Sequence, residues 1–213
     1  MDVTSALRIH LLGPIEIQDR DITLRLPPSS TTRSLLAYLV LRHDQAITRD
    51  RLIGVFWPER PDPRARRALS NALWQIRRAL GDHSGRLVAE QDKVTFAFQL
   101  GDWVDVEEFE TAIRRHGDIL QRDQTSPTSL SILSQAVSLH RSDFLEGCYD
   151  DWALLQRERL REMHLRGLEM LATLHKQADN YERALLYAQQ LAAADPLHES
   201  VHRELMRLYH LLG

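Results

Sequence analysis

Residues 62–80, DPRARRALSNALWQIRRAL, place guanidinium groups at helical spacing. At 100° per residue the apolar side chains form one stripe of a helix. The opposite face carries Arg64, Arg67, Asn71, Trp74 and Arg78, and Arg66 and Arg77 flank it. A guanidinium group pairs bidentately with guanine or phosphate, and the amide of Asn71 suits adenine. This chemistry is typical of a helix that reads DNA, and the alternative is a basic face that meets only solvent.

Other reactive residue types occur in patterns that complete no catalytic or metal site. Residues 198–202 spell HESVH, an H-E-x-x-H string that binds zinc in metalloproteases. The string begins in a turn after Pro196, and only the 11 residues 203–213 follow to supply a third ligand. Cys148 is the single cysteine and has no nearby basic residue to activate its thiol. We therefore predict no enzyme activity, no catalytic residue, no metal and no cofactor, with a zinc hydrolase as an alternative that metal analysis would test.

The elements around the basic stretch favour a compact domain in the first half of the chain. Strand-like runs at 7–12, 15–18 and 22–26 are separated by turn residues, which predicts a small antiparallel sheet. Helical periodicity follows at 29–42 and 49–56, with Ser29 and Thr48 as N-cap residues. After Gly81, a hairpin with a polar tip is predicted over 86–98. Three helices followed by such a ribbon form a winged helix, whose third helix enters the major groove.

The second half of the chain is predicted to be helical, over 107–115, 129–138 and 151–175. A period of 34 residues from Leu165 fits a tetratricopeptide repeat, and the register starts again at Glu199. The matching positions are Leu168, Leu171, Ala172, Tyr181, Ala184, Pro196, Leu205, Met206 and Tyr209. Because the chain stops where the next repeat helix would begin, we expect a truncated C-terminus.

Charge divides between the halves of the chain, although the net charge is only −3. Residues 1–104 hold 15 Lys and Arg against 12 Asp and Glu, whereas residues 105–213 hold 12 against 18. A basic nucleic-acid module joined to an acidic module has this asymmetry. The longest apolar run near the N-terminus is far below the roughly 18 residues of a spanning helix. We therefore predict a cytoplasmic protein with no membrane segment.

The order of these elements resembles the Streptomyces antibiotic regulatory protein (SARP) family over nearly the whole chain. The residues that carry the resemblance are the strand run, two helices, RRALSNALWQIRRALG, the hairpin, and Val104-Asp105-Val106 leading into the acidic half. The resemblance implies an OmpR-type winged helix with an N-terminal sheet, joined to a helical bacterial transcriptional activation domain. It also implies a sequence-specific activator that binds repeated promoter sites and contacts RNA polymerase.

The predicted fold is thus mainly α with a small β part, with a winged-helix DNA-binding domain at 1–104 and an all-α, tetratricopeptide-like activation domain at 105–213. Double-stranded DNA, RNA polymerase and a second copy on the DNA are the expected partners. Arg49, Arg51 and Lys93 are candidates for contacts to the DNA backbone. Trp74 departs from the small or polar residue expected on a DNA-reading face. A winged helix that no longer reads DNA, and serves as an interaction or sensor module, is therefore the rival hypothesis.

Overall fold

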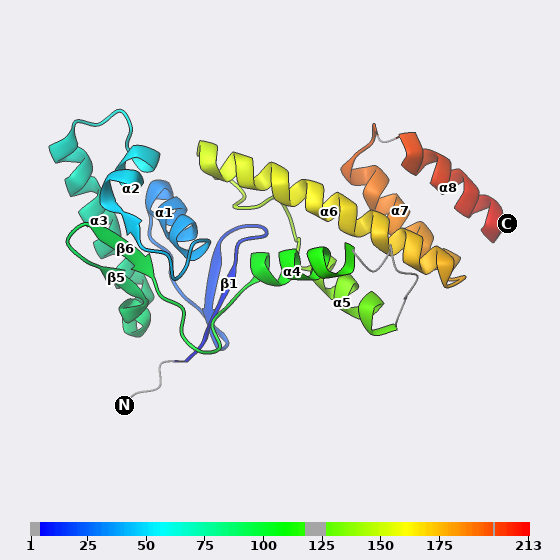
Figure 1. The fold of residues 1–213 in the computed structure, drawn as a ribbon, viewed down its shortest axis with the longest axis horizontal. Helices are drawn as coiled ribbons and strands as arrows, with labels where there is room; N and C mark the ends of the chain where they lie inside the picture. Colours follow the sequence, from blue (N-terminus) through cyan, green and yellow to red (C-terminus); the bar gives the residue numbers. More distant parts are fainter. Residues whose placement is uncertain (1–4, 118–126, 198) are drawn as a thin grey trace. The chain divides into compact units, whose positions relative to one another are not determined.

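The computed structural model describes residues 5–117, 127–197 and 199–213, and these form two compact units. Unit 1 comprises residues up to Val106 together with Phe144–Leu155, and unit 2 comprises Glu107–Asp143 and Gln156–Gly213. Figure 1 shows the strands gathered in unit 1 and helices α5, α7 and α8 in unit 2. No helix of the described ranges is long and apolar enough to cross a membrane.

A four-stranded sheet opens unit 1, in the order β3-β2-β1-β7. Its strands are β1 (Leu7–His10), β2 (Glu16–Asp19), β3 (Ile22–Thr23) and β7 (Trp103–Val104). The antiparallel pairing of β1, β2 and β3 was predicted, but β7 was not, and it lies parallel to β1. The sheet is therefore mixed. Asp105 directly follows β7, and Leu11 and Leu12 directly follow β1. The buried carboxylate of Asp105 holds these two segments together, because it accepts hydrogen bonds from the backbone N–H groups of Leu11 and Leu12 at 2.9 and 3.0 Å.

The three helices of the winged helix follow the sheet as expected. They are α1 (Ser30–Val40), α2 (Arg49–Phe56) and α3 (Asp62–Leu80). The Ser29 and Thr48 hydroxyls cap α1 and α2 by accepting hydrogen bonds from backbone N–H groups, both at 3.3 Å. Helix α3 ends at Gly81, whose φ of 55° lies in the left-handed region that favours glycine. A short 3-10 turn, η1 (Gly81–Arg86), leads on to the hairpin.

The hairpin consists of β5 (Leu87–Ala89) and β6 (Lys93–Phe96), and we call it the wing. Its register pairs Leu87 with Phe96 and Ala89 with Val94. A short strand β4 (Ile47–Thr48) just before α2 also pairs with β6, so the wing belongs to a three-stranded sheet. That third strand ties the wing to the start of α2, and it was not predicted from the sequence.

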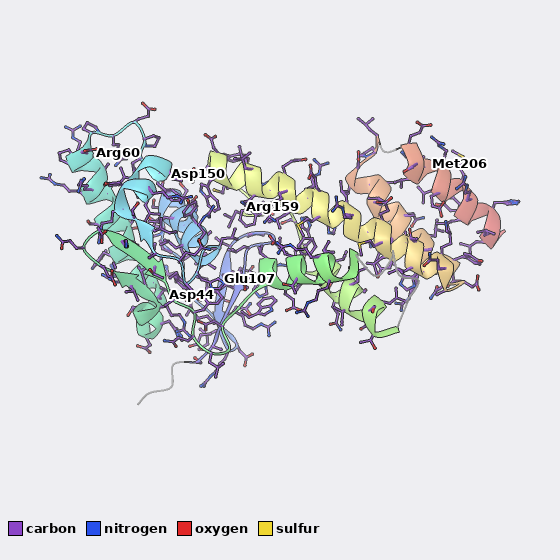
Figure 2. The ribbon with its side chains drawn as sticks, in the orientation of Figure 1. Asp44, Arg60, Glu107, Asp150, Arg159 and Met206 are labelled. Carbon is purple, nitrogen blue, oxygen red and sulfur yellow. The ribbon has the colours of Figure 1, made fainter. Side chains whose placement is uncertain are left out.

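Unit 1 also contains residues 144–155, which lie outside the range expected for the winged helix. The backbone N–H of Leu145 donates to Leu11 O at 3.0 Å, and Trp152 Nε1 donates to the Ser34 hydroxyl at 3.1 Å. The Trp152 ring also packs edge-on to Tyr38 of α1. Asp150, labelled in Figure 2, lies directly before α6 (Asp151–Gln177), whose first turn therefore belongs to unit 1.

Unit 2 is helical, as predicted. It holds most of α4 (Asp105–Gly117) and α6, together with α5 (Pro127–Ser138), α7 (Tyr181–Ala194) and α8 (Glu199–Leu212). The predicted repeat positions Leu168, Leu171 and Ala184 are buried. Met206 and Tyr209 are instead 68% and 53% exposed, because α8 packs on α7 through Val201 and Leu208. Figure 2 labels Met206 on this helix.

Candidate nucleic-acid interface

Helix α3 has one buried and one exposed face, as its sequence pattern predicts. The buried side chains, none more than 3% exposed, are Ala65, Leu69, Ala72, Leu73, Ile76 and Leu80. They seat α3 against α1, α2 and β5. The opposite face exposes Arg64, Arg67, Asn71, Trp74 and Arg78 together, and we call this set the basic face. Five side chains from four turns of helix therefore share one solvent-accessible surface.

The flanking residues Arg66 and Arg77 lie toward neighbouring elements and contact them. One Arg66 nitrogen, Nη2, lies 3.4 Å from Asp50 Oδ1 of α2, and both side chains are exposed. Arg77 Nη2 donates to Leu87 O at 3.3 Å, which links α3 to the first strand of the wing. Arg77 thus has a hydrogen-bond partner within the protein. The positive charge of the basic face comes from Arg64, Arg67 and Arg78 and does not depend on Arg77.

The wing and α2 supply the remaining predicted cations. The Arg49 backbone N–H donates to Asp92 O at 2.8 Å, and its guanidinium group donates to Glu90 O at 3.3 Å. Arg49 therefore holds the wing tip to the start of α2. Lys93 and Arg51 are exposed. Burial lowers the pKa of Arg42. Tyr38, whose ring centre lies 3.8 Å from the guanidinium, partly opposes this lowering, and the positive charge of Arg51 adds to it.

Trp74 lines an open groove of about 890 Å³ along the second half of α3. Its side chain is 56% exposed, and the Arg78 guanidinium carbon lies 5.5 Å from the centre of its ring. The rest of its lining includes residues 25–28, Arg33 of α1 and the acidic Glu146. Trp74 is thus an open part of the basic face.

The groove adds two arginines, Arg25 and Arg33, to the candidate surface. Arg33 Nη1 donates to Pro27 O at 3.1 Å and to Pro28 O at 2.8 Å, which fixes the segment beside α3. Arg25 is exposed. Neither Arg25 nor Arg33 is among the site residues predicted from the sequence. Arg25 and Arg33 line the same groove as Arg78 because the chain between β3 and α1 folds back beside α3. No local sequence pattern predicts this tertiary contact.

The H-E-x-x-H string is only partly described, because His198 lies outside the described residues. His202 Nε2 lies 2.8 Å from Pro196 O, within hydrogen-bond distance. Residues 5–117, 127–197 and 199–213 contain no group of three or more metal-ligating side chains. Cys148 donates its thiol to the Ser34 hydroxyl at 3.4 Å, a structural contact.

Comparison with known proteins points to transcriptional regulators. A family model described as a bacterial transcriptional activator domain matches residues 104–213. Two curated relatives, both called transcriptional regulatory protein MoaR1, come from Mycobacterium bovis (strain BCG / Pasteur 1173P2) and Mycobacterium tuberculosis (strain ATCC 25618 / H37Rv). Each is 34% identical over 77 residues, which are 36% of this chain and 24% of the relative. The alignment thus spans about a quarter of those proteins.

A solved structure has a similar fold. It is that of Mycobacterium tuberculosis EmbR in complex with a low affinity phosphopeptide, with a TM-score of 0.78 and 20% identity. The match covers 96% of this chain and 55% of the EmbR chain. It confirms the predicted fold, mainly helical with a small β part. Because the family model covers more than half of the sequence, the chain belongs to the bacterial transcriptional activator domain family of transcriptional regulators, as its resemblance to the SARP family predicted.

Proposed function

We propose that this chain is a sequence-specific DNA-binding transcriptional activator. The observation that carries the proposal is the basic face of α3. It exposes Arg64, Arg67, Asn71 and Arg78 on a helix whose other side is core. No acidic residue follows Asp62 in this helix, so α3 itself presents no negative side chain to phosphate beyond its start. A surface helix that served only to cover a core would need no such concentration of guanidinium groups.

In this proposal α3 reads the major groove. Arginine donates two hydrogen bonds to guanine, and the Asn71 amide both donates to and accepts from adenine. We assign Lys93 on the wing and Arg51 on α2 to contacts with DNA phosphates. Such contacts position the protein on the duplex but do not distinguish one base sequence from another. Arg77 and Arg49 act mainly by holding α3 and α2 to the wing, as their hydrogen bonds suggest. Arg66, whose pair with Asp50 is exposed, remains a candidate for DNA contact.

The remaining parts of the proposal concern the rest of the chain. We place the DNA-binding domain at 1–104 and the activation domain at 105–213. The activation domain is proposed to contact RNA polymerase and to support a homodimer on repeated promoter sites. A protein that regulates transcription in this way acts in the cytoplasm of a bacterium.

Selection of binding sites from random DNA, followed by fluorescence anisotropy on the selected site, tests the proposal. Each of Arg67→Ala and Arg78→Ala is expected to weaken specific binding by about 1–3 kcal/mol. Arg207→Ala is the matched control, because it removes an arginine that is 74% exposed on α8. Specific binding that survives both α3 substitutions would refute the assignment of the basic face.

The rival function, an interaction module that has ceased to read DNA, is favoured by one observation. Trp74 is exposed in a groove of about 890 Å³, as an aromatic anchor for a protein partner would be. If the selection from random DNA yields no enriched sequence, and Trp74→Ala abolishes binding to a protein partner, the chain functions as an interaction module and not as a DNA reader.

A further inference from the structure

Unit 2 contains a cavity of about 650 Å³ among α5, α6 and α7 that is wide open to solvent. Its volume lies within the range of roughly 300–1,000 Å³ that is usual for small-molecule sites. Aliphatic side chains from all three helices form much of its wall. The polar side chains that line it are Ser134, Ser138, His140, His164, Tyr187 and Gln190. The cavity therefore combines an apolar body with a few hydrogen-bonding groups.

Two histidines form one wall of this cavity. The rings of His140 and His164 stack with centroids 4.1 Å apart and an interplanar angle of 17°, next to Phe109 of α4. Burial lowers the pKa of His164 to about 4, helped by the neighbouring His140, and burial also lowers the pKa of His140. Both rings are therefore uncharged at neutral pH. Within the described part of the chain, His164 Nδ1 is buried without a hydrogen-bond partner.

None of the described residues that line the cavity is an Asp, Glu, Lys or Arg. Where a charged ligand gives up water against this lining, it gains no opposite charge from the residues that form it, which is costly. A neutral ligand loses less, and hydroxyl, amide and imidazole groups can satisfy one or two of its polar atoms. The lining thus selects against charge and for a molecule with an apolar body and a small polar end.

We propose that this cavity is a binding site for a small uncharged organic molecule that carries a hydroxyl or amide group on an apolar body. The site lies entirely within unit 2, and the proposal does not depend on DNA binding. The Ser134 hydroxyl and the Tyr187 hydroxyl lie 2.9 Å apart and already bridge α5 and α7. A ligand that bonds to this pair would contact two helices of the activation domain at once.

Three probes of similar shape and different charge test the proposal, namely benzamide, benzoate and benzylammonium. Each is titrated into the isotope-labelled full chain, and binding is followed by two-dimensional NMR. Benzamide is expected to shift signals of Val137, Leu168 and Ala193, and to bind at least about fivefold more tightly than either charged probe. Equal binding of all three probes, or no localised shift up to the solubility limit of benzamide, would overturn the proposal.

A pair of substitutions keeps the test independent of folding. Leu186 lines the cavity and is 49% exposed, so Leu186→Trp fills the opening without replacing a core residue. Leu211 is 52% exposed on α8 and does not line the cavity, which makes Leu211→Trp the matched control. Benzamide binding is expected to be lost in the first variant and kept in the second, with similar melting temperatures. Binding that persists in Leu186→Trp would place the probe elsewhere and contradict the proposal.

Discussion

At the scale of single residues, Trp74 connects the two candidate functions of unit 1. The ring is more than half exposed and lies beside Arg78, so a partner that covers the second half of α3 would contact it. The other tryptophans are Trp57, which is buried, and Trp103 and Trp152, which are half-buried. Trp74 is therefore the tryptophan best placed to report on binding at α3.

We predict that DNA binding changes the tryptophan fluorescence and that most of this change disappears in Trp74→Phe. The physical reason is that Trp74 loses its water contacts when DNA covers the basic face, while the other three rings do not. Titration of the selected DNA into both proteins measures the effect. Trp152→Phe serves as the control and should keep the signal. A full signal in Trp74→Phe would mean that DNA does not reach the second half of α3.

Arg86 is the residue whose importance is least visible in the sequence. Its guanidinium is buried and donates to both carboxylate oxygens of Asp102, at 2.7 and 2.8 Å. It also contacts His83 and donates to Ser5 O. Burial raises the pKa of Asp102, but the hydrogen bonds from Arg86 and from backbone N–H groups outweigh it and leave the pKa below its usual value.

Removing one partner of this buried pair is expected to cost much more than removing a surface pair. Arg86→Met leaves the Asp102 charge buried and uncompensated, which costs about 3–5 kcal/mol of unfolding free energy. Arg66→Ala breaks the exposed pair with Asp50 and costs about 0–1 kcal/mol. Urea unfolding followed by tryptophan fluorescence compares the two variants. Similar losses in both would show that the Arg86 network contributes little.

At the scale of elements, helix packing in unit 2 depends on a glycine within α6. A Cβ atom at Gly167 would lie 2.7 Å from Ile113 Cδ1 and 2.9 Å from Val137 Cγ2. Both distances are far below van der Waals contact, so the Ile113 side chain of α4 and the Val137 side chain of α5 would have to shift to admit a larger residue. Gly54 in α2 has nothing within 4 Å of the same position.

These two glycines give opposite predictions for the same substitution. Alanine is the better helix former by about 1 kcal/mol, so Gly54→Ala should stabilise the protein by about 0.5–1 kcal/mol. At Gly167 the overpacking cost of about 1–3 kcal/mol outweighs that gain, and Gly167→Ala should be destabilising. Thermal unfolding by circular dichroism checks both signs. Stabilisation by Gly167→Ala would mean that α4 and α5 shift freely to accept a methyl group.

The elements also show where sequence reasoning works and where it fails. The bounds of α2 and α3 were predicted because local signals set them, namely the Thr48 cap, the prolines between the helices and Gly81. The pairing of β7 with β1 and of β4 with β6 joins residues about 50 to 100 positions apart in runs of two residues. Such short strands carry no periodicity. The same contrast applies to the candidate site. The basic face of α3 was predictable because one helix carries it, whereas its extension by Arg25 and Arg33 depends on contacts between distant segments and was not.

At the scale of the whole molecule, the charge division between the two halves determines how DNA binding should respond to salt. Residues 1–104 carry an excess of three positive charges and residues 105–213 an excess of six negative charges. On the proposed function we expect the first half to make the phosphate contacts that release counterions, and the number of these contacts sets the slope of log K against log salt concentration. The second half of the chain should not make this slope steeper.

This division predicts two separable effects in the full chain. Lys93→Ala removes a proposed phosphate contact from the wing, so it should reduce the salt slope by about 1 and weaken selected and random DNA equally. Arg67→Ala removes a proposed base contact, so it should reduce the ratio of affinities for selected over random DNA. Arg207→Ala in the acidic half should change neither quantity. Anisotropy titrations at several salt concentrations measure both, and a loss of specificity in Lys93→Ala would show that the wing reads bases instead of only positioning α3.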